Sequence, residues 1–301
     1  MLQDKPARRF AGALLVFLLM TARSGAEGLP ARGSVALFGQ RIEYYDVGTG
    51  PVVVLLHGLG SSAEHDWGAC ITRLSAHHRV LAPDQLGFGA SDKPLIDYGI
   101  QTWVDFLGEF LRVEKVDTFT LAGESLGGWI AAQYAIQSLG ATSTAGAAFP
   151  LPRPSRLVLV DAAGHRHLAE GFGGSNPGLS LAGSRALLSA IYFDPARATE
   201  AAAREQFALS LSKGDAWTIH SLMSNRSVVA EAVDDKLGQI SVPTLVVWGA
   251  NDHLIPIEDG RDFAARIPGA RLVVVPESGH APGIEKPDEV VAAIEGFLGG
   301  R

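Results

Sequence analysis

Short apolar runs alternate with longer amphipathic segments along most of the chain. Runs rich in valine and leucine, typical of strands buried on both faces of a sheet, stand at residues 52–56, 80–82, 118–122, 157–160, 243–248 and 271–275. Segments with helical spacing lie between them, among others at residues 62–76, 101–113 and 128–135. Because strands that alternate with helices pair in parallel, the pattern predicts an α/β fold with a mostly parallel central sheet flanked by helices. Residues 33–47 instead predict an antiparallel opening hairpin that turns at Gly39 and Gln40.

Residues 1–26 have the pattern of a secretory signal peptide. Basic residues precede an apolar run at residues 10–20, and the small residues Ser24, Gly25 and Ala26 follow as a cleavage pattern. We therefore expect an exported protein, periplasmic or secreted. The apolar run is short for a bilayer span, so an uncleaved N-terminal membrane anchor is the weaker alternative, and no stable span is expected after cleavage.

Composition and charge agree with a globular enzyme. The 301 residues are 47% hydrophobic and 19% charged, enough for one sheet-based domain with an additional cap. The net charge is −7, to which residues 1–26 contribute +3, so the remaining chain carries −10. An acidic body without a basic stripe argues against nucleic-acid binding. Cys70 is the only cysteine, so no internal disulfide can form, and it is expected to pack within a helix.

A G-x-S-x-G motif stands at residues 123–127, between the strand at 118–122 and the helix at 128–135. Strand, tight turn and helix are the context of a nucleophile elbow, and this context favours that interpretation over an ordinary Gly-Ser turn. The turn is strained, and its glycines avoid collisions with neighbouring backbone. It would lift the Ser125 hydroxyl clear of the sheet and direct the first amides of the helix toward a ligand.

A base and an acid follow in the order that a serine nucleophile requires. Asp252 ends the turn after the strand at 243–248, and His280 follows the strand at 271–275. The carboxyl ends of parallel strands meet at one edge of a sheet, so both side chains are expected beside Ser125. Asp161, which follows the strand at 157–160, is the alternative acid.

With these pieces in order, the chain resembles the α/β-hydrolase fold superfamily, of the serine hydrolase or esterase type with a cap, over residues 35–298. The matching segments lie at residues 55–60, 83–91, 123–127, 248–252 and 279–282. The resemblance implies a catalytic triad of Ser125, His280 and Asp252, and an oxyanion hole made by the backbone N–H groups of Leu59 and Leu126. It implies no cofactor and no metal.

Other polar residues near these motifs have simpler explanations. His57 precedes the oxyanion loop and is expected to make structural hydrogen bonds, as are Asp84 and Ser91 in the 83–91 loop. Glu124 is expected to make a local hydrogen bond. The histidine pairs at 77–78 and at 165 and 167 lack further ligands at metal spacing and are expected on the surface or the lid.

The resemblance divides the mature chain into a hydrolase core at residues 27–162 and 239–301 and a helical cap at 163–238, inserted after the sixth strand. Helices are expected at 182–192, 196–211 and 215–221, and 140–154 reads as a surface loop. The apolar cap predicts an uncharged small-molecule substrate. Its candidate substrate-binding residues are Phe172, Tyr192, Trp217 and Met223.

Several functions share this architecture. Dehalogenases and epoxide hydrolases resemble it but place an aspartate where Ser125 stands. The carbon–carbon bond hydrolases of aromatic ring cleavage keep the serine, but they commonly have tryptophan after the catalytic histidine, where this chain has Ala281, and a glycine-richer oxyanion loop. We therefore rank an exported carboxylesterase first and a carbon–carbon hydrolase second. Acyl transfer, perhydrolysis and a non-catalytic binding protein remain alternatives.

Overall fold

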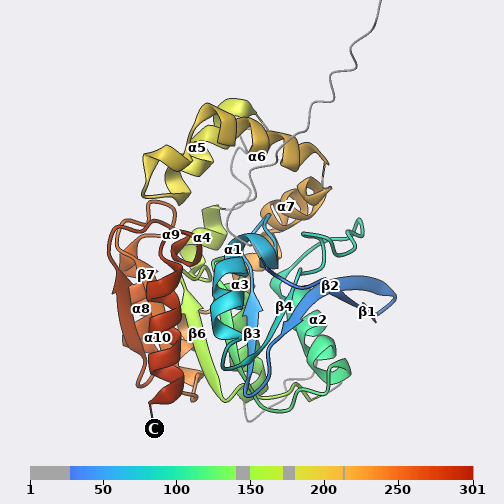
Figure 1. Ribbon diagram of the computed structural model, residues 1–301, viewed down its shortest axis with the longest axis vertical. Coiled ribbons are helices and arrows are strands. Elements are labelled where there is room, and N and C mark those ends of the chain that lie inside the picture. The colour runs from blue at the N-terminus through green and yellow to red at the C-terminus, as the bar shows by residue number, and fades with distance from the viewer. Residues whose placement is uncertain (1–27, 140–149, 172–179, 213, 301) are drawn as a thin grey trace, which may run out of the picture.

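The computed structural model describes residues 28–139, 150–171, 180–212 and 214–300, whose strands form one eight-stranded sheet (Figure 1). Their order across the sheet is β1-β2-β4-β3-β5-β6-β7-β8. The strands are β1 (Gly33–Leu37), β2 (Gln40–Val47), β3 (Val52–Leu56), β4 (Arg79–Pro83), β5 (Phe119–Glu124), β6 (Arg156–Val160), β7 (Thr244–Gly249) and β8 (Arg271–Val275). The predicted α/β fold is confirmed.

The sheet is parallel except at its first edge, where β1 pairs antiparallel with β2 and β2 with β4. The predicted opening hairpin is therefore present, but its turn lies one residue earlier, at Phe38 and Gly39. Their φ angles are 50° and 78°, and a two-residue hairpin turn with positive φ at both positions matches the twist of the flanking strands.

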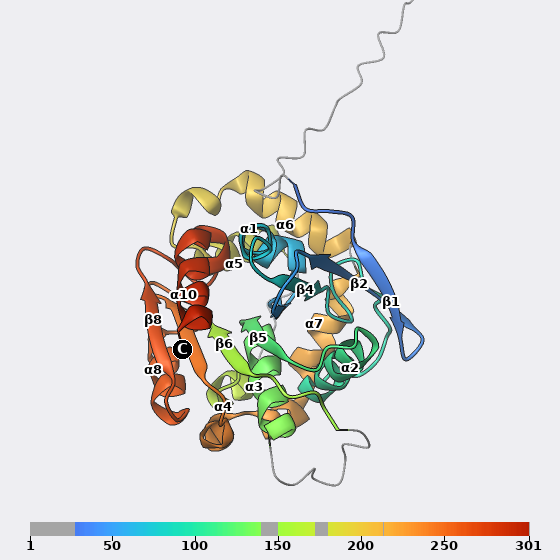
Figure 2. The same cartoon turned by 60° about the horizontal axis from the view of Figure 1, so that its bottom comes forward.

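Helices cover both faces of the sheet, which explains why the strand sequences are continuously apolar. Figure 2 shows α1 (Ala63–Leu74) and α10 (Pro287–Gly299) on one face and α2 (Ile100–Val113) and α3 (Leu126–Leu139) on the other. Along β3, Val53 and Leu55 belong to the core formed with α1 and α10, and the alternate positions face the opposite core. That second core also includes side chains of α8 (Ile257–Arg266).

The segment between β6 and β7 is helical, as expected of a cap after the sixth strand. It contains α4 (Arg166–Gly171), α5 (Leu181–Ile191), α6 (Glu200–Ser212) and α7 (Asp215–Ser224), with short 3-10 helices η1 (Pro195–Arg197), η2 (Arg226–Glu231) and η3 (Asp234–Gln239). Figure 1 shows α5, α6 and α7 over the edge of the sheet where β3 and β6 end. Leu188, Ala198 and Ala203 form a small core inside this segment.

Some sequence predictions fall outside the described residues. These are the signal peptide at 1–26, most of the 140–154 loop and the candidate substrate-binding residue Phe172. Residues 150–154 belong to no helix or strand, and Leu151 packs against the core near Gly108 of α2. In the described part of the chain, no helix combines the length and apolar character needed to cross a bilayer.

Candidate active site

Ser125 is the single residue between the end of β5 and the start of α3, and it has a left-handed conformation with φ 53°. Such a conformation costs a residue with a side chain about 1–3 kcal/mol, so the surroundings must enforce it. The Ser125 N–H donates to the Val160 carbonyl at 3.0 Å, and its own carbonyl accepts from Ala163 N at 2.9 Å. The neighbouring strand β6 and the residues after it therefore fix the turn.

The two glycines of the motif are required by close backbone contacts. A Cβ on Gly123 would lie 2.1 Å from the Gly127 carbonyl oxygen, and one on Gly127 would lie 2.3 Å from that of Leu56. Both obstacles are backbone atoms that cannot rotate away. This packing explains why the motif has glycine at both positions.

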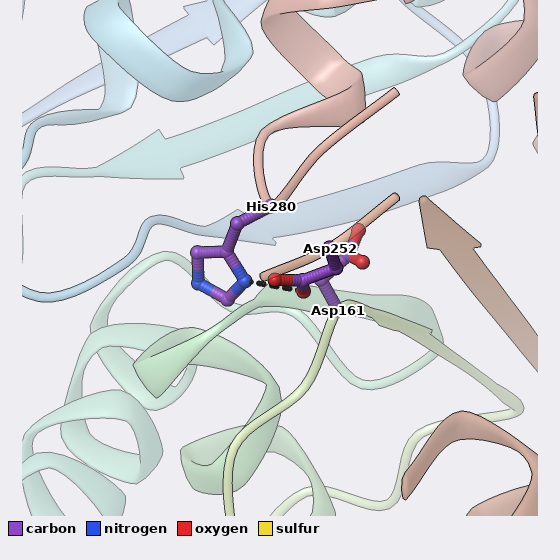
Figure 3. Close-up of side chains that lie close together, drawn as sticks. All are labelled: Asp161, Asp252 and His280. Atoms are coloured by element: carbon purple, nitrogen blue, oxygen red, sulfur yellow. Dashed lines mark hydrogen bonds and ion pairs between the residues drawn. The ribbon is translucent and has the colours of Figure 1, made fainter. Parts of the chain in front are cut away.

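The predicted serine, histidine and acid come together from the ends of three strands. His280 Nε2 lies 2.9 Å from Ser125 Oγ. His280 Nδ1 lies 2.7 Å from Asp252 Oδ2, the contact drawn in Figure 3. The other oxygen of Asp252 accepts hydrogen bonds from Leu254 N and Ile255 N at 2.7 and 2.8 Å. With Asp252 as acceptor, Nδ1 carries the proton, which leaves Nε2 free to accept the serine proton.

Of the two residues predicted to form the oxyanion hole, one directly follows the serine and the other is in the loop that packs beside it. Leu126 begins α3 directly after Ser125, and Leu59 is in the loop after β3. A Cβ on the adjacent Gly58 would lie 3.3 Å from Ser125 Cβ, which places this loop against the elbow. Among the described residues, neither Leu59 N–H nor Leu126 N–H donates to a protein acceptor. Both are available to a ligand oxygen.

Asp66, in the first turn of α1, holds that loop and was missed by sequence reasoning. Its buried carboxylate accepts from Gly58 N at 2.7 Å and from the Ser61 hydroxyl. An acid at the start of the helix after a glycine-containing loop is the signal that would have indicated it, since side-chain acceptors at this position commonly satisfy free backbone N–H groups.

A family model for the alpha/beta hydrolase family matches residues 53–293. The chain belongs to this family. A 2-hydroxy-6-oxo-2,4-heptadienoate hydrolase of Pseudomonas putida is 30% identical over 271 residues, covering 86% of this chain and 93% of that protein. A meta-cleavage product hydrolase from Pseudomonas fluorescens has a similar structure, with 28% identity and a TM-score of 0.74 over 88% of this chain and 97% of that one. A thermophilic esterase from Thermogutta terrifontis is 25% identical, with a TM-score of 0.69 over 89% and 98%.

His57 of this hydrolase has both ring nitrogens engaged in structural hydrogen bonds. Nδ1 lies 2.8 Å from the Gly58 carbonyl oxygen, and Nε2 accepts from Gln85 N at 2.9 Å. Asp84 accepts from the N–H groups of Ala63 and Ala90, each at 2.8 Å, while Ser91 Oγ donates to the Asp84 carbonyl oxygen at 2.5 Å. These contacts fit the structural roles expected for all three residues.

Asp161, the alternative acid, lies in the same cluster. One ligand-type atom from each of Asp161, Asp252 and His280 falls within 4.8 Å of the other two (Figure 3). Asp161 Oδ1 accepts from Gly249 N at 2.9 Å, whereas the histidine is hydrogen-bonded to Asp252. Burial, together with the neighbouring Asp252, raises the pKa of Asp161 well above its ordinary value.

The hydrogen bond expected of Glu124 is not found for its Oε2 atom. This buried oxygen has no hydrogen-bond partner among the described residues. Burial raises the pKa of Glu124 well above its ordinary value, and the nearby carboxylates of Asp66, Asp161 and Asp252 act in the same direction. Glu124 is therefore a buried acid next to the nucleophile, in surroundings that favour its protonated form.

The cap approaches the oxyanion loop through Ile219, which was not among the expected residues. Trp217 is 41% exposed, and its ring N–H donates to the Ile96 carbonyl, so it faces the loop before α2. Two residues further along α7, Ile219 approaches the oxyanion loop: its Cδ1 would lie 3.1 Å from a Cβ on Gly60. Met223, four residues later, lies on the same helical face as Ile219 and remains a candidate substrate-binding residue.

The end of α5 makes the second contact between cap and site. The His280 N–H donates to the Ile191 carbonyl at 2.6 Å. Tyr192 follows at the C-cap of α5, half-buried, with the Arg197 guanidinium 5.4 Å from its ring centroid. Burial raises the pKa of Tyr192 to about 12, so its hydroxyl stays protonated at neutral pH.

Glu285 connects the cap to the histidine loop and had no sequence signal beyond its place in α9 (Pro282–Glu285). Its Oε2 accepts from Gly279 N at 2.7 Å, next to His280. Its Oε1 accepts from Phe193 N and Asp194 N at 2.9 and 3.2 Å, just after α5. One carboxylate thus joins two segments that are far apart in sequence.

The histidines at 165 and 167 were expected on the surface or the lid, and His165 is instead buried. Its Nε2 lies 2.9 Å from Asp262 Oδ2, and His167 Nε2 lies 3.2 Å from Asp259 Oδ2. These imidazole–carboxylate pairs join α4 and the residue before it to α8 of the core.

Proposed function

We propose that this protein is a serine hydrolase that cleaves a bond at an acyl carbon through an acyl-enzyme intermediate. The hydrogen-bonded series of Ser125, His280 and Asp252 is the observation that carries the proposal. A serine hydroxyl is a weak nucleophile until a neighbouring base removes its proton, and here the base is oriented by a buried carboxylate.

In this mechanism Ser125 Oγ attacks the carbonyl carbon while His280 Nε2 takes the hydroxyl proton. Asp252 stabilises the imidazolium that results. The N–H groups of Leu59 and Leu126 donate to the oxyanion of the tetrahedral intermediate, an interaction worth about 3–4 kcal/mol for a donor of this kind. His280 then protonates the leaving group, and a water molecule, deprotonated by the same histidine, releases the acyl group.

The relatives favour a carbon–carbon bond as the one that is cleaved. Their names describe hydrolases of 2-hydroxy-6-oxo-dienoates and of meta-cleavage products, at 28–30% identity over 86–88% of this chain. In such a substrate the ketone carbon would accept Ser125, and the bond to the conjugated carbon would break. That carbon would take its proton from the substrate's enol hydroxyl or from His280. Carbon–carbon bond hydrolysis, ranked second from sequence alone, is therefore the first activity to test.

Carboxylic esters are the second candidate, and a charge argument favours them. A dienoate carries a carboxylate, yet the hydrogen-bond and ion-pair partners of Ser125, His280, Glu124 and Asp161 include no lysine or arginine among the described residues. Ala281 follows His280, where ring-cleavage hydrolases commonly have tryptophan. The esterase of similar structure is compatible with this alternative.

The test is one protein preparation assayed on both substrate classes. It would receive p-nitrophenyl esters from acetate to decanoate and 2-hydroxy-6-oxo-dienoates, with Ser125→Ala as the control. We expect turnover of at least one class, and loss of at least about 10⁴-fold in the variant. The class with the higher kcat/KM identifies the bond. Turnover that persists in the variant would contradict the role given to Ser125.

A further inference from the structure

Asp161 occupies the position after β6 that corresponds to the position of Asp252 after β7. The two strands are neighbours in the sheet, with Val160 paired to Val247, so the residues that follow them emerge side by side. Asp161 is fully buried and has a left-handed backbone with φ 40°, held by its N–H to the Val247 carbonyl at 3.0 Å. The fold maintains a second carboxyl group at a strained position beside the first.

The hydrogen bonds of the two carboxyl groups are unequal. Asp252 has donors for both oxygens: His280 on Oδ2, and Leu254 N and Ile255 N on Oδ1. Asp161 has Gly249 N on Oδ1, but its Oδ2 is buried with no hydrogen-bond partner in the described part of the chain. An ionised Asp161 would place an unpaired buried charge beside a second negative charge, which is strongly unfavourable.

A proton on Asp161 Oδ2 removes both difficulties. The atom becomes a donor, and the neighbouring carboxylate of Asp252 becomes its acceptor, as in other carboxyl pairs that share one proton. Burial first, and Asp252 second, raise the pKa of Asp161 in agreement with this assignment. The other ionisable groups that act on Asp161 include Glu285, also acidic, and Glu124 lies close enough for the two carboxyls to affect each other.

We propose that Asp161 and Asp252 hold one proton between them, with Asp161 as the neutral donor, and that Asp161 is a second positioning residue for His280. The proposal rests on the proposed function of Ser125 and His280. In the native protein Asp252 carries the charge that orients the imidazole. When Asp252 loses its charge, Asp161 can ionise within reach of the histidine, because one atom from each of the three residues lies within 4.8 Å of the others.

Four proteins test the proposal: the native chain, Asp161→Asn, Asp252→Asn and the double variant. The asparagine amide at 161 can replace the proposed O–H donor but cannot ionise, so Asp161→Asn should lose less than about tenfold in kcat, and less than Asp252→Asn. Asp252→Asn should lose activity but retain at least tenfold more than the double variant. Equal activity of Asp252→Asn and the double variant, or a hundredfold loss in Asp161→Asn alone, would overturn the proposal.

The pH profile supplies a readout that a purely structural role would not move. In Asp252→Asn, kcat should rise with pH through an additional ionisation, that of Asp161, which is absent from the native profile. If the double variant does not fold, this profile decides alone: an additional ionisation supports the pair, and its absence contradicts it. Labelling of the native protein by a fluorophosphonate distinguishes failure of the Asp161 proposal from failure of the proposed function. If Ser125 is not labelled, the proposed function itself is wrong.

Discussion

At the scale of single residues, the site depends on backbone contacts that leave no room for side chains. Ser125 keeps a left-handed conformation because Val160 and Ala163 hold its backbone on either side. Gly123 and Gly127 permit this turn because the nearest atoms to their missing Cβ positions are backbone carbonyls. The cost of the strained serine is thus met by the surrounding sheet and helix.

Substitution of Gly127 should show this directly. Gly127→Ala places a Cβ 2.3 Å from the Leu56 carbonyl oxygen, so β3 and α3 must separate. We expect a loss of about 3 kcal/mol or more in the free energy of unfolding, by analogy with other overpacked cores. The matched control is Gly296→Ala in α10, where nothing lies within 4 Å. It should stabilise the protein by up to about 1 kcal/mol, since alanine favours helix. Urea unfolding of both variants would check the prediction, and equal effects would contradict it.

The raised pKa of Glu124 predicts a pH dependence of stability. Its pKa is raised in the folded protein, so above the ordinary pKa the unfolded chain releases a proton that the folded chain retains. The stability therefore falls as pH rises from about 4.5 toward the folded pKa. Glu124→Gln removes this titration, so its stability relative to the native protein should increase between pH 5 and pH 8, by at most about 1.4 kcal/mol per pH unit. Urea unfolding at the two pH values measures it. The control is Glu289→Gln, an exposed change whose free energy of unfolding relative to the native protein should not vary with pH. The same constant difference for Glu124→Gln would mean that Glu124 is ionised in the folded protein.

At the scale of elements, the site is the meeting point of loops that follow β3, β5, β6, β7 and β8. The cap adds two contacts, Ile219 of α7 at the oxyanion loop and Ile191 of α5 at the histidine. Glu285 reinforces the second contact by accepting backbone hydrogen bonds from Gly279, next to His280, and from Phe193, just after α5. The position of α5 and the position of His280 are therefore coupled.

Glu285→Gln should weaken this coupling. A glutamine presents an NH₂ group to backbone N–H donors, which leaves at least one donor without an acceptor, at a cost of about 1–3 kcal/mol. We expect kcat to fall about tenfold or more as His280 moves from Ser125, with a larger loss for substrates long enough to contact the cap. Glu289→Gln, an exposed change of the same charge in α10, is the control and should match the native enzyme. A normal kcat with only a lowered melting temperature would limit Glu285 to a structural role.

At the scale of the whole molecule, the sequence was sufficient for the architecture and for the three central site residues. Both follow from local signals: apolar runs define the strands, and the turns after them carry Ser125, Asp252 and His280 at one edge. The contacts of the cap could not be predicted in the same way. Whether Trp217 or Ile219 faces the site depends on the rotation of α7 against the core, and the helix is apolar on more than one side.

Long-range hydrogen bonds were equally hidden. Glu285, and the pair of buried His165 with the partly exposed Asp262, each join segments whose proximity exists only in the folded chain. The motifs could not rank the substrate classes either, because the same serine, histidine and aspartate serve in the cleavage of ester bonds and of carbon–carbon bonds.

Export remains a proposal at this scale, since residues 1–26 lie outside the described structure. If they act as a signal peptide, expression in a host with a matching export pathway should yield a chain that begins near Glu27 outside the cytoplasm. Intact-mass measurement of fractionated cells would establish the N-terminus. A full-length chain retained with the cytoplasmic fraction would contradict the proposal, and a full-length membrane-bound chain would favour the anchor.

Covalent labelling would show whether His280 activates Ser125. The native protein would be treated with a fluorophosphonate, and the site of modification would be found by peptide mass spectrometry. We expect a single adduct on Ser125, no adduct in Ser125→Ala, and labelling slowed by at least about 10³-fold in His280→Ala. An unlabelled native protein, or an adduct on another residue, would contradict this expectation.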